Sequence, residues 1–392
     1  MDKLYFCEVK FYFTLYPRIS DLTKDLFGFD LPLPIQSFGF MMAMGFITAY
    51  FMIYYELKRK AKMGIFSSFE IHHTTEGEPS KTDILVNLVL GAVLGYKLGY
   101  LFTNYTAFNA NPQQILLSTE GSLGGLFFGL VVMGAYKGYE YYKYKGVKPK
   151  KEKKKAYPHD LMGNVIFIAA ISGILGAKLF AVLETWDDFI KHPIQSLVAF
   201  DGLTYYGGLI LGSASVIYYI RRYKIPVLPY LDAAAPGLMA TYGVGRIGCH
   251  ISGDGDWGIQ VGDGTVSCLA NKPDFFKIFP DWFYAYNYPN NVLGETPGYV
   301  YPTPLWEAIL GIGLGIGLLL IGRKLKLHHG VLFCIYLILN GIERFLIEKI
   351  RVNIPYNILG LKITQAEILS FLLILLGIAG WVWIHKRQKM TK

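Results

Sequence analysis

Long apolar segments are the feature that most restricts what this chain can fold into. Crossing a hydrocarbon core of about 30 Å requires about 20 mostly apolar residues. The chain is 53% hydrophobic and has a mean hydropathy of +0.33, which soluble domains of this length do not show. We therefore predict an all-α integral membrane protein, a polytopic bundle of about nine transmembrane helices. The expected spans are roughly 38–57, 84–103, 121–142, 161–183, 203–220, 231–248, 306–322, 330–348 and 366–384.

The basic residues are distributed unevenly between the connections. The net charge is +9, and the connections after spans one, three, five and seven are rich in lysine and arginine, as is the C-terminal end "KRQKMTK". The connections after spans two and four hold one lysine between them. This alternation follows the positive-inside rule and predicts an outer N-terminus and a cytoplasmic C-terminus. It explains the basic excess as a topology signal, so we predict no nucleic-acid partner.

We expect residues 1–392 to form a single multi-pass membrane domain. Residues 1–37 have no apolar core typical of a cleavable signal peptide and are predicted to be an arm on the outer face. Residues 249–305 are predicted to form a periplasmic loop region. We expect the cysteines to be free buried thiols, with one disulfide as the alternative, formed among Cys7, Cys249 and Cys268.

Two stretches of the chain, 95–129 and 176–212, resemble each other. The matched residues Gly95, Lys97, Phe108, Pro112 and Gln114 precede their counterparts Gly176, Lys178, Phe189, Pro193 and Gln195 by 81 positions. After a gap of two residues, Gly124, Gly125 and Gly129 match Gly207, Gly208 and Gly212. We predict that 82–142 is an extra two-span repeat of 159–220. It has "SLGGL" where the second copy has "LTYYGGL", so we expect it to keep the packing and to lack the chemistry. Both copies run in the same direction, unlike the inverted repeats of transporters.

The glycine-rich stretch "GVGRIGCHISGDGDWG" (243–258) contains two weak patterns. The "GVGRIG" pattern follows an apolar helix instead of a strand, so it does not indicate nucleotide binding. His250, Asp254 and Asp256 fit no defined metal loop. We therefore predict no metal.

Charged residues within the predicted spans indicate a polar cavity between helices. A charge at the bilayer centre costs about 2.5–3.5 kcal/mol even on the lenient insertion scale. Arginines outnumber what ion pairing would need, and an arginine fork binds phosphate bidentately. The cavity is therefore expected to take an anionic head group. Arg344 and Glu348 are four residues apart and lie on one helix face. The other charged residues expected in the cavity are Arg246, Arg351, Glu307 and Lys178.

These residues carry a resemblance to a known family. "GRIGCHISGDGDWG" is similar to the signature G-R-x-G-N-F-x-N-x-E-x-x-G of bacterial prolipoprotein diacylglyceryl transferases. Four further stretches resemble family motifs in the same order, "GAKL" (176–179), "YYGGL" (205–209), "YPTPLWEA" (301–308) and "ERFLIEKIR" (343–351). The resemblance covers the first span and residues 160–392.

The resemblance implies a transferase of the bacterial inner membrane with its site near the outer leaflet. Diacylglyceryl would pass from phosphatidylglycerol to the lipobox cysteine thiol of a prolipoprotein signal peptide, without a cofactor. Arg246 and Arg344 match the family arginines and would hold the leaving phosphate. The other residues expected to bind substrate are Arg351, Gly207, Gly208, Asp254, Glu307 and Glu348.

The chain departs from the family pattern at the expected base. Tyr206 stands where the family has histidine before the Gly-Gly. We expect Tyr206 to polarise the thiol or ester with His250 assisting; the alternative is that His250 itself is the base, because an imidazole titrates near ~6.5 and a phenol near ~10. The other departures are Cys249, Asp254, Tyr301, Asn340 and Phe38, where the family has asparagine, glutamate, histidine, tyrosine and tyrosine. Two alternative functions stay open on the sequence, a lipid or anion transporter and an inactive lipid-binding homologue.

Overall fold

The computed structural model describes residues 15–29, 35–110, 115, 118–191, 193–198, 204–353, 356–358 and 361–390. Within these residues, nine helices have 18 residues or more, and each coincides with a predicted span. They are α2 (Ser37–Lys62), α3 (Lys81–Thr103), α6 (Leu123–Tyr144), α7 (Met162–Glu184), α10 (Tyr205–Arg222), α11 (Val227–Ser252), α14 (Thr303–Lys324), α15 (Val331–Glu348) and α16 (Gln365–Met390).

Of the helical segments in the described ranges, five are long and apolar enough to cross a membrane. They are Ser37–Lys62, Lys81–Thr103, Pro158–Glu184, Thr303–Lys324 and Gln365–Arg387. The protein is therefore a mainly helical, multi-pass membrane protein, as predicted. That α6, α10, α11 and α15 also cross, and that the N-terminus lies outside, remain predictions.

The all-α expectation misses three short antiparallel ribbons. They pair β1 (Phe69–Thr74) with β2 (Lys151–Ala156), β3 (Tyr286–Asn287) with β4 (Tyr299–Val300), and β5 (Tyr356–Ile358) with β6 (Leu361–Ile363). In the first ribbon Phe69 lies opposite Ala156. Its strand β2 is the lysine-rich "KEKKKA", a composition that does not favour a strand, so its sequence gave no strand signal.

The described residues divide into two compact units. One lies within Met1–Phe66 and Lys224–Lys392, and the other within Ser67–Tyr223. We call them the core unit and the inserted unit, because the second interrupts the first in the sequence. Each is described by itself.

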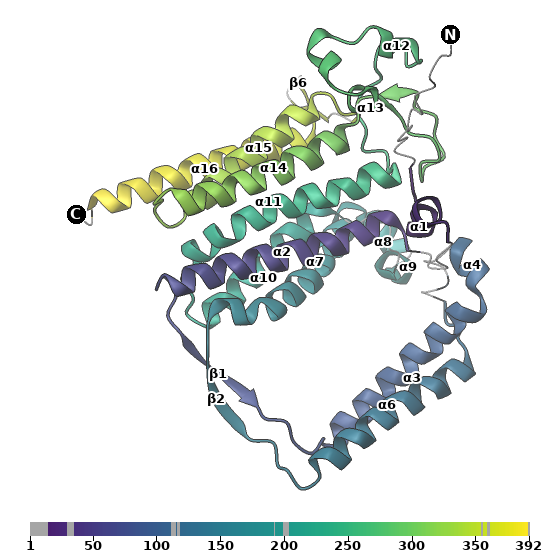
Figure 1. Ribbon diagram of the computed structural model, residues 1–392, viewed down its shortest axis with the longest axis vertical. Helices are drawn as coiled ribbons and strands as arrows, with labels where there is room; N and C mark the ends of the chain where they lie inside the picture. Colours follow the sequence, from purple (N-terminus) through teal and green to yellow (C-terminus); the bar gives the residue numbers. More distant parts are fainter. Residues whose placement is uncertain are drawn as a thin grey trace, which may run out of the picture. The chain divides into compact units, whose positions relative to one another are not determined.

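In the core unit the long helices lie side by side (Figure 1). Helix α11 is central, with α2 and α14 against it and α15 in contact with both α11 and α14; α16 packs on α15. The contact between α11 and α14 is close, because a Cβ on Gly243 would lie 2.6 Å from the backbone nitrogen of Ile312, and one on Gly311 would lie 2.8 Å from the Cα of Gly243. Small residues allow such approach in membrane helices.

A buried acidic residue on α11 holds the start of α15. Asp232 accepts hydrogen bonds from the backbone N–H groups of Gly330 (2.7 Å) and Phe333 (3.0 Å). These are donors that a helix N-terminus cannot satisfy by itself. Lys60 of α2 lies 4.0 Å from the same carboxylate. The carboxylate thus links three helices at one end of the core unit.

Glu56 of α2 is a second buried acidic residue of the core unit. Its carboxylate pairs with Arg59 one turn later at 2.9 Å and with Arg323 of α14 at 2.7 Å. The Glu56 residue is 4% exposed. A buried carboxylate is retained where cations compensate it, and here one cation is local and the other distant in sequence.

Short elements connect the long helices of the core unit. The predicted arm contains α1 (Ile19–Phe27), and its residue Tyr16 bonds the backbone carbonyl of Ile251 through its N–H at 3.0 Å. The predicted loop region 249–305 begins inside α11 and contains α12 (Ser267–Ala270), η2 (Asp274–Ile278), α13 (Asp281–Tyr284) and the β3–β4 ribbon. Cys249, Cys268 and Cys334 are free and buried. Cys7 lies outside the described residues.

The inserted unit contains two helix pairs, α3 with α6 and α7 with α10. Its short elements are α4 (Tyr105–Ala110), η1 (Pro158–Leu161), α8 (Trp186–Lys191) and α9 (Pro193–Val198). Both pairs make the same glycine contact. A Cβ on Gly95 would lie 2.3 Å from the carbonyl oxygen of Gly125, and one on Gly176 would lie 2.3 Å from that of Gly207.

By this contact, Gly125 of the first copy corresponds to Gly207 of the second. In the sequence comparison Gly125 corresponds to Gly208 instead. The helix starts agree with the contact, because Ser122 and Thr204 are the N-caps of α6 and α10. The packing register therefore has a gap of one residue where the sequence comparison uses two. Lys97 donates hydrogen bonds to the backbone carbonyls of Ser118 and Glu120. Its role in the first copy is therefore explained by support of the loop before α6. Two of the matched residues, Pro112 and Gln114, lie outside the described residues.

Candidate functional site

The site is built on the close crossing of α11 and α14. Arg246 follows Gly243 by three residues on α11, and Glu307 precedes Gly311 by four on α14, so both lie about one helical turn from the contact. Their side chains meet, with Nε of Arg246 3.3 Å from Oε2 of Glu307. The glycines thus bring two charges together that are far apart in sequence.

Glu307 is the hub of the site. It is completely buried, and its Oε1 accepts from Nη1 of Arg344 on α15 at 2.8 Å and from the hydroxyl of Tyr242 at 2.8 Å. Its Oε2 faces Arg246. The guanidinium of Arg246 also lies over the Tyr242 ring, 5.4 Å from the centroid. One carboxylate therefore holds both family-matched arginines in place.

Glu348 fixes Arg344 from the other side. The two residues are one turn apart on α15, as predicted, with Nη2 of Arg344 3.2 Å from Oε2 of Glu348. Oε1 of Glu348 accepts a hydrogen bond from Nδ2 of Asn353 at 2.6 Å. Arg344 therefore lies between two carboxylates, which sets the direction of its fork.

Asp256 joins Arg246 to Arg351. Its two carboxylate oxygens pair with one arginine each. The aspartate is held by Thr303, whose hydroxyl donates to its backbone carbonyl at 2.8 Å. Arg351 is brought alongside by a backbone bridge to Gly258. Backbone contacts thus hold both partners of the Asp256–Arg351 ion pair in place.

The resemblance places the signature glutamate at Asp254, whereas the carboxylate that pairs with Arg246 and Arg351 is that of Asp256. Oδ1 of Asp254 accepts the backbone N–H of Asp256 at 3.3 Å, so Asp254 supports the turn that presents Asp256.

The expectation that arginines outnumber their partners is wrong in the described part of the chain. Arg246, Arg344 and Arg351 are matched by three carboxylates, those of Glu307, Glu348 and Asp256. What is left over is hydrogen-bonding capacity. The side chain of Arg351 is 7% exposed, and its Nε and Nη1 atoms are buried without a hydrogen-bond partner. Buried donors without partners are costly, so this fork is where an anionic group would gain most.

His250 is buried one turn beyond Arg246, on the same helix. It is 4% exposed, and its Nδ1 lies 3.0 Å from the hydroxyl of Tyr288. Burial raises the pKa of Tyr286 to about 12 and that of Tyr288 well above its usual range, so both phenols stay protonated at neutral pH. Tyr288 can therefore donate to the imidazole. Rings of both tyrosines surround His250, a setting that disfavours a charged imidazolium.

Tyr206, Gly207 and Gly208 belong to the inserted unit and begin α10. The glycines pack against α7, since a Cβ on Gly207 would lie 2.2 Å from the carbonyl oxygen of Gly176, and one on Gly208 would lie 3.0 Å from that of Gly173. Helix packing thus accounts for both glycines by itself. Lys178 also lies in this unit, on α7.

In the part of the chain that the structure describes, one group of side chains approaches metal-binding geometry. Single ligand atoms of Cys249, Asp254 and Asp256 lie within 4.8 Å of one another. Asp256 is already paired with Arg246 and Arg351, and two guanidinium groups beside a site oppose a cation. The charge pattern fits an anion better than a metal ion.

Tyr242, Asp256 and Glu343 were not among the predicted site residues. Tyr242 is i−4 from Arg246, a spacing that puts the two on one helix face and could have indicated it. Glu343 is 5% exposed, and both its carboxylate oxygens are buried without a hydrogen-bond partner. Asp256 was considered only as a metal ligand.

Comparison with known proteins gives a consistent result. The family model described as prolipoprotein diacylglyceryl transferase matches residues 25–151 and again 144–383. The chain is similar to proteins named phosphatidylglycerol--prolipoprotein diacylglyceryl transferase, with 31% identity to the one from Streptococcus uberis (61% of this chain, 85% of the relative). It is 27% identical to the one from Shouchella clausii (65% and 83%). A protein of Clostridium perfringens with the same name and the number 2 is 31% identical (57% and 80%).

Proposed function

Since this chain belongs to the prolipoprotein diacylglyceryl transferase family, we propose that it transfers diacylglyceryl from phosphatidylglycerol to the lipobox cysteine of prolipoproteins, the first step of lipoprotein maturation. The observation that carries the proposal is that Arg246 and Arg344 both contact one buried carboxylate, that of Glu307. Asp256 links Arg246 to Arg351, whose guanidinium has donors without a hydrogen-bond partner. Fixed positive charge of this kind suits a departing phosphate.

The reaction requires one bond to form and one to break. The cysteine sulfur bonds to the glycerol carbon of the diacylglyceryl group, while the bond from that carbon to the phosphate oxygen breaks. The products are a thioether and glycerol 1-phosphate, and the thiol proton passes to a base. Sulfur attacks as thiolate, and the phosphate leaves more easily when its growing charge is neutralised.

In this proposal Arg246 and Arg344 bind the phosphate, and Arg351 adds its unsatisfied donors. Glu307, Glu348 and Asp256 are positioning residues that hold the forks in the absence of lipid. Carboxylate and phosphate oxygens use the same fork geometry, so the head group can take over hydrogen bonds that the carboxylates make. Asp254 supports this arrangement through the turn before Asp256.

The identity of the base is a separate proposal. Tyr206 occupies the family's histidine position, and His250 is its rival. The burial of His250 against Tyr288 favours a structural histidine, which supports Tyr206 as the group that polarises the thiol or ester. A phenol that acts as base becomes active as the pH rises towards ~10.

We expect Tyr206→Phe to lower the rate of lipidation and to remove its rise with alkaline pH, because the variant has no ionisable group at that position. His250→Gln is expected to keep the wild-type pH profile. Initial rates measured between about pH 6 and 9 for both variants test this. If Tyr206→Phe keeps the full rate and His250→Gln loses it, the base is His250.

The location follows from the same proposal. We propose that the protein resides in the bacterial cytoplasmic membrane with nine spans, its N-terminus outside, and its site near the outer leaflet, where signal peptides with a lipobox emerge. The hairpin of α3 and α6 is proposed to be a structural repeat without reaction chemistry. No cofactor enters the proposed reaction.

Rescue of a bacterium depleted of its own diacylglyceryl transferase tests the function. We expect expression of this chain to restore growth and the lipidation of a reporter prolipoprotein. Substitution of the reporter's lipobox cysteine by serine is the control and should abolish the modification. Protein present in the membrane without any lipidation would identify an inactive homologue instead.

A further inference from the structure

Glu343 is a buried acidic residue that the reaction described above does not use. It lies on α15 and is 5% exposed, and both its carboxylate oxygens are buried without a hydrogen-bond partner. Burying a polar group without partners costs free energy, and an ionisable side chain among membrane helices usually serves a function. The surroundings of Glu343 indicate which function this is.

The register between α11 and α15 decides what Glu343 faces. Oδ1 of Asp232 accepts the backbone N–H of Phe333, and Nδ2 of Asn340 lies 3.7 Å from Sδ of Met239. In both pairs the two residues are 101 positions apart. The two helices therefore keep one register along their contact, and the residues three positions after Met239 and Asn340 meet again one turn later.

The residues that meet at this turn are Tyr242 and Glu343, and their side chains interact electrostatically. The hydroxyl of Tyr242 donates to Oε1 of Glu307 at 2.8 Å. A tyrosine has a single hydroxyl proton to donate, so Tyr242 has none left for Glu343. Arg246 and Arg344 also act on Glu343, which places it beside the arginines of the site.

The charges of the site balance without Glu343. Its three arginines are matched by the three carboxylates of Glu307, Glu348 and Asp256. An ionised Glu343 would add a fourth carboxylate that interacts with Glu307, and a bound phosphate would add more negative charge. A buried carboxyl group beside like charges takes up a proton instead. Glu343 is therefore neutral when an anionic head group is bound.

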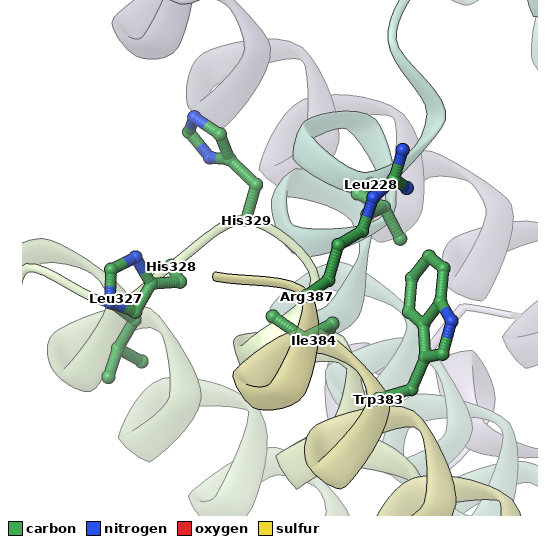
Figure 2. Close-up of a pocket in the computed structure, with 7 residues that line it drawn as sticks. All are labelled: Leu228, Leu327, His328, His329, Trp383, Ile384 and Arg387. Carbon is green, nitrogen blue, oxygen red and sulfur yellow. The ribbon is translucent and has the colours of Figure 1, made fainter. Parts of the chain in front are cut away.

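The pocket at the start of α11 is a separate feature (Figure 2). It has a volume of about 320 Å³, and its lining includes Leu228, Ile384 and Arg387 but no residue of the site. Tyr242 follows Leu228 by 14 residues on α11, a rise of about 21 Å at 1.5 Å per residue. Glu343 thus belongs to the arginine site and not to this pocket.

We propose, on the basis of the function proposed above, that the neutral carboxyl group of Glu343 is a further catalytic residue that donates a hydrogen bond to the phosphate of the lipid head group. A carboxylic acid kept neutral by its surroundings can act as such a donor. The bond strengthens as negative charge grows on the phosphate oxygen, and this favours the transition state. Because the oxygens of Glu343 have no other partner, the group gives up no hydrogen bond when it turns to the phosphate.

Two substitutions separate a neutral donor from a charged group. Glu343→Leu removes the donor, and we expect the rate of lipidation to fall about 10²-fold, as for loss of one donor to a developing oxyanion. Glu343→Gln keeps a neutral donor of similar shape and should retain at least about tenfold more activity than Glu343→Leu. Equal rates of the two variants would overturn the proposal, because the amide could then not replace the carboxyl group.

The stability of the same variant distinguishes a catalytic from a structural group. Glu343→Leu replaces a buried polar group without partners by an apolar one, so we expect its thermal unfolding temperature in detergent to rise. Glu56→Leu is the matched control and should lower that temperature, because it leaves Arg59 and Arg323 without their carboxylate. A lower unfolding temperature of Glu343→Leu would show that Glu343 supports the fold, and would contradict the proposal.

Infrared spectroscopy detects the proton itself. We expect the spectrum of the purified wild-type protein minus that of Glu343→Gln to contain the C=O stretch of a protonated carboxylic acid at neutral pH. The corresponding difference for Glu56→Gln should lack this band, since that carboxylate is paired with two arginines. Absence of the band from the Glu343 difference would overturn the proposal.

Addition of lipid then tests the hydrogen bond independently of transfer. Phosphatidylglycerol should shift the C=O band of Glu343, whereas diacylglycerol, which has no phosphate, should leave it unchanged. A band that phosphatidylglycerol does not move contradicts the donor role. A band that moves in a wild-type protein without transferase activity would retain the hydrogen bond and refute only the proposed function.

Discussion

Replacement of Arg246 or Arg344 by alanine is expected to lower diacylglyceryl transfer by at least 10²–10³-fold, because loss of one charge-stabilising contact at a reacting centre costs about 2.7–4 kcal/mol. Both guanidiniums contact the buried carboxylate of Glu307, so each variant removes one of the two cations held there. Initial rates of the purified variants with phosphatidylglycerol and a lipobox peptide measure the effect. Lysine at either position should rescue poorly, because an ammonium group cannot reproduce the fork.

Arg323 is the matched control for these variants. It also pairs with a buried glutamate, Glu56, but it lies at the far end of α14 from Glu307. Arg323→Ala should therefore keep most of the transfer activity. Near-normal lipidation by Arg246→Ala or Arg344→Ala, with the protein inserted and folded, would contradict the phosphate-binding role.

Replacement of Glu307 by glutamine is expected to abolish activity and to lower stability. Breaking a buried ion pair by removing one partner costs about 3–5 kcal/mol, and this carboxylate has two arginine partners. Glutamine keeps the shape but cannot compensate Arg246 and Arg344, so the forks lose their fixed positions. Thermal unfolding in detergent measures the stability, and the rate of lipidation measures the activity.

Glu56→Gln is the corresponding control, because Glu56 also joins two arginines, Arg59 and Arg323. These arginines are more exposed, at 29% and 45%, so we expect a smaller loss of stability. Activity per folded molecule should be kept in Glu56→Gln and lost in Glu307→Gln. Equal activities of the two folded variants would mean that Glu307 acts only as a structural ion pair.

The sequence predicted the helices well, because their signal is local. Apolar length gave all nine helical segments, and the i,i+4 spacing predicted the contact of Arg344 with Glu348. The hub could not be predicted in this way. The meeting of Arg246 with Glu307 depends on the crossing at Gly243 and Gly311, and nothing in the sequence specifies which glycines of two helices will touch.

The errors have a common physical origin. Counting arginines against carboxylates on the sequence left out Asp256, because its contacts with Arg246 and Arg351 depend on the turn after α11. The register of the repeat was also placed one residue away, since neighbouring glycines such as Gly124 and Gly125 look alike in sequence and only packing distinguishes them. Local patterns specify elements, and contacts between elements decide the site.

The interruption of the core unit by residues 67–223 has a consequence for biosynthesis. Helix α2 is complete at Lys62, but its partner α11 begins only at Val227. At about 5–20 residues per second the ribosome needs on the order of ten seconds or more to produce the intervening chain. During this interval α2 carries Glu56 without the distant Arg323. Arg59, one turn from Glu56 on the same helix, is the partner that is already synthesised during this interval, so we expect the pair of Glu56 with Arg59 to form before the pair with Arg323.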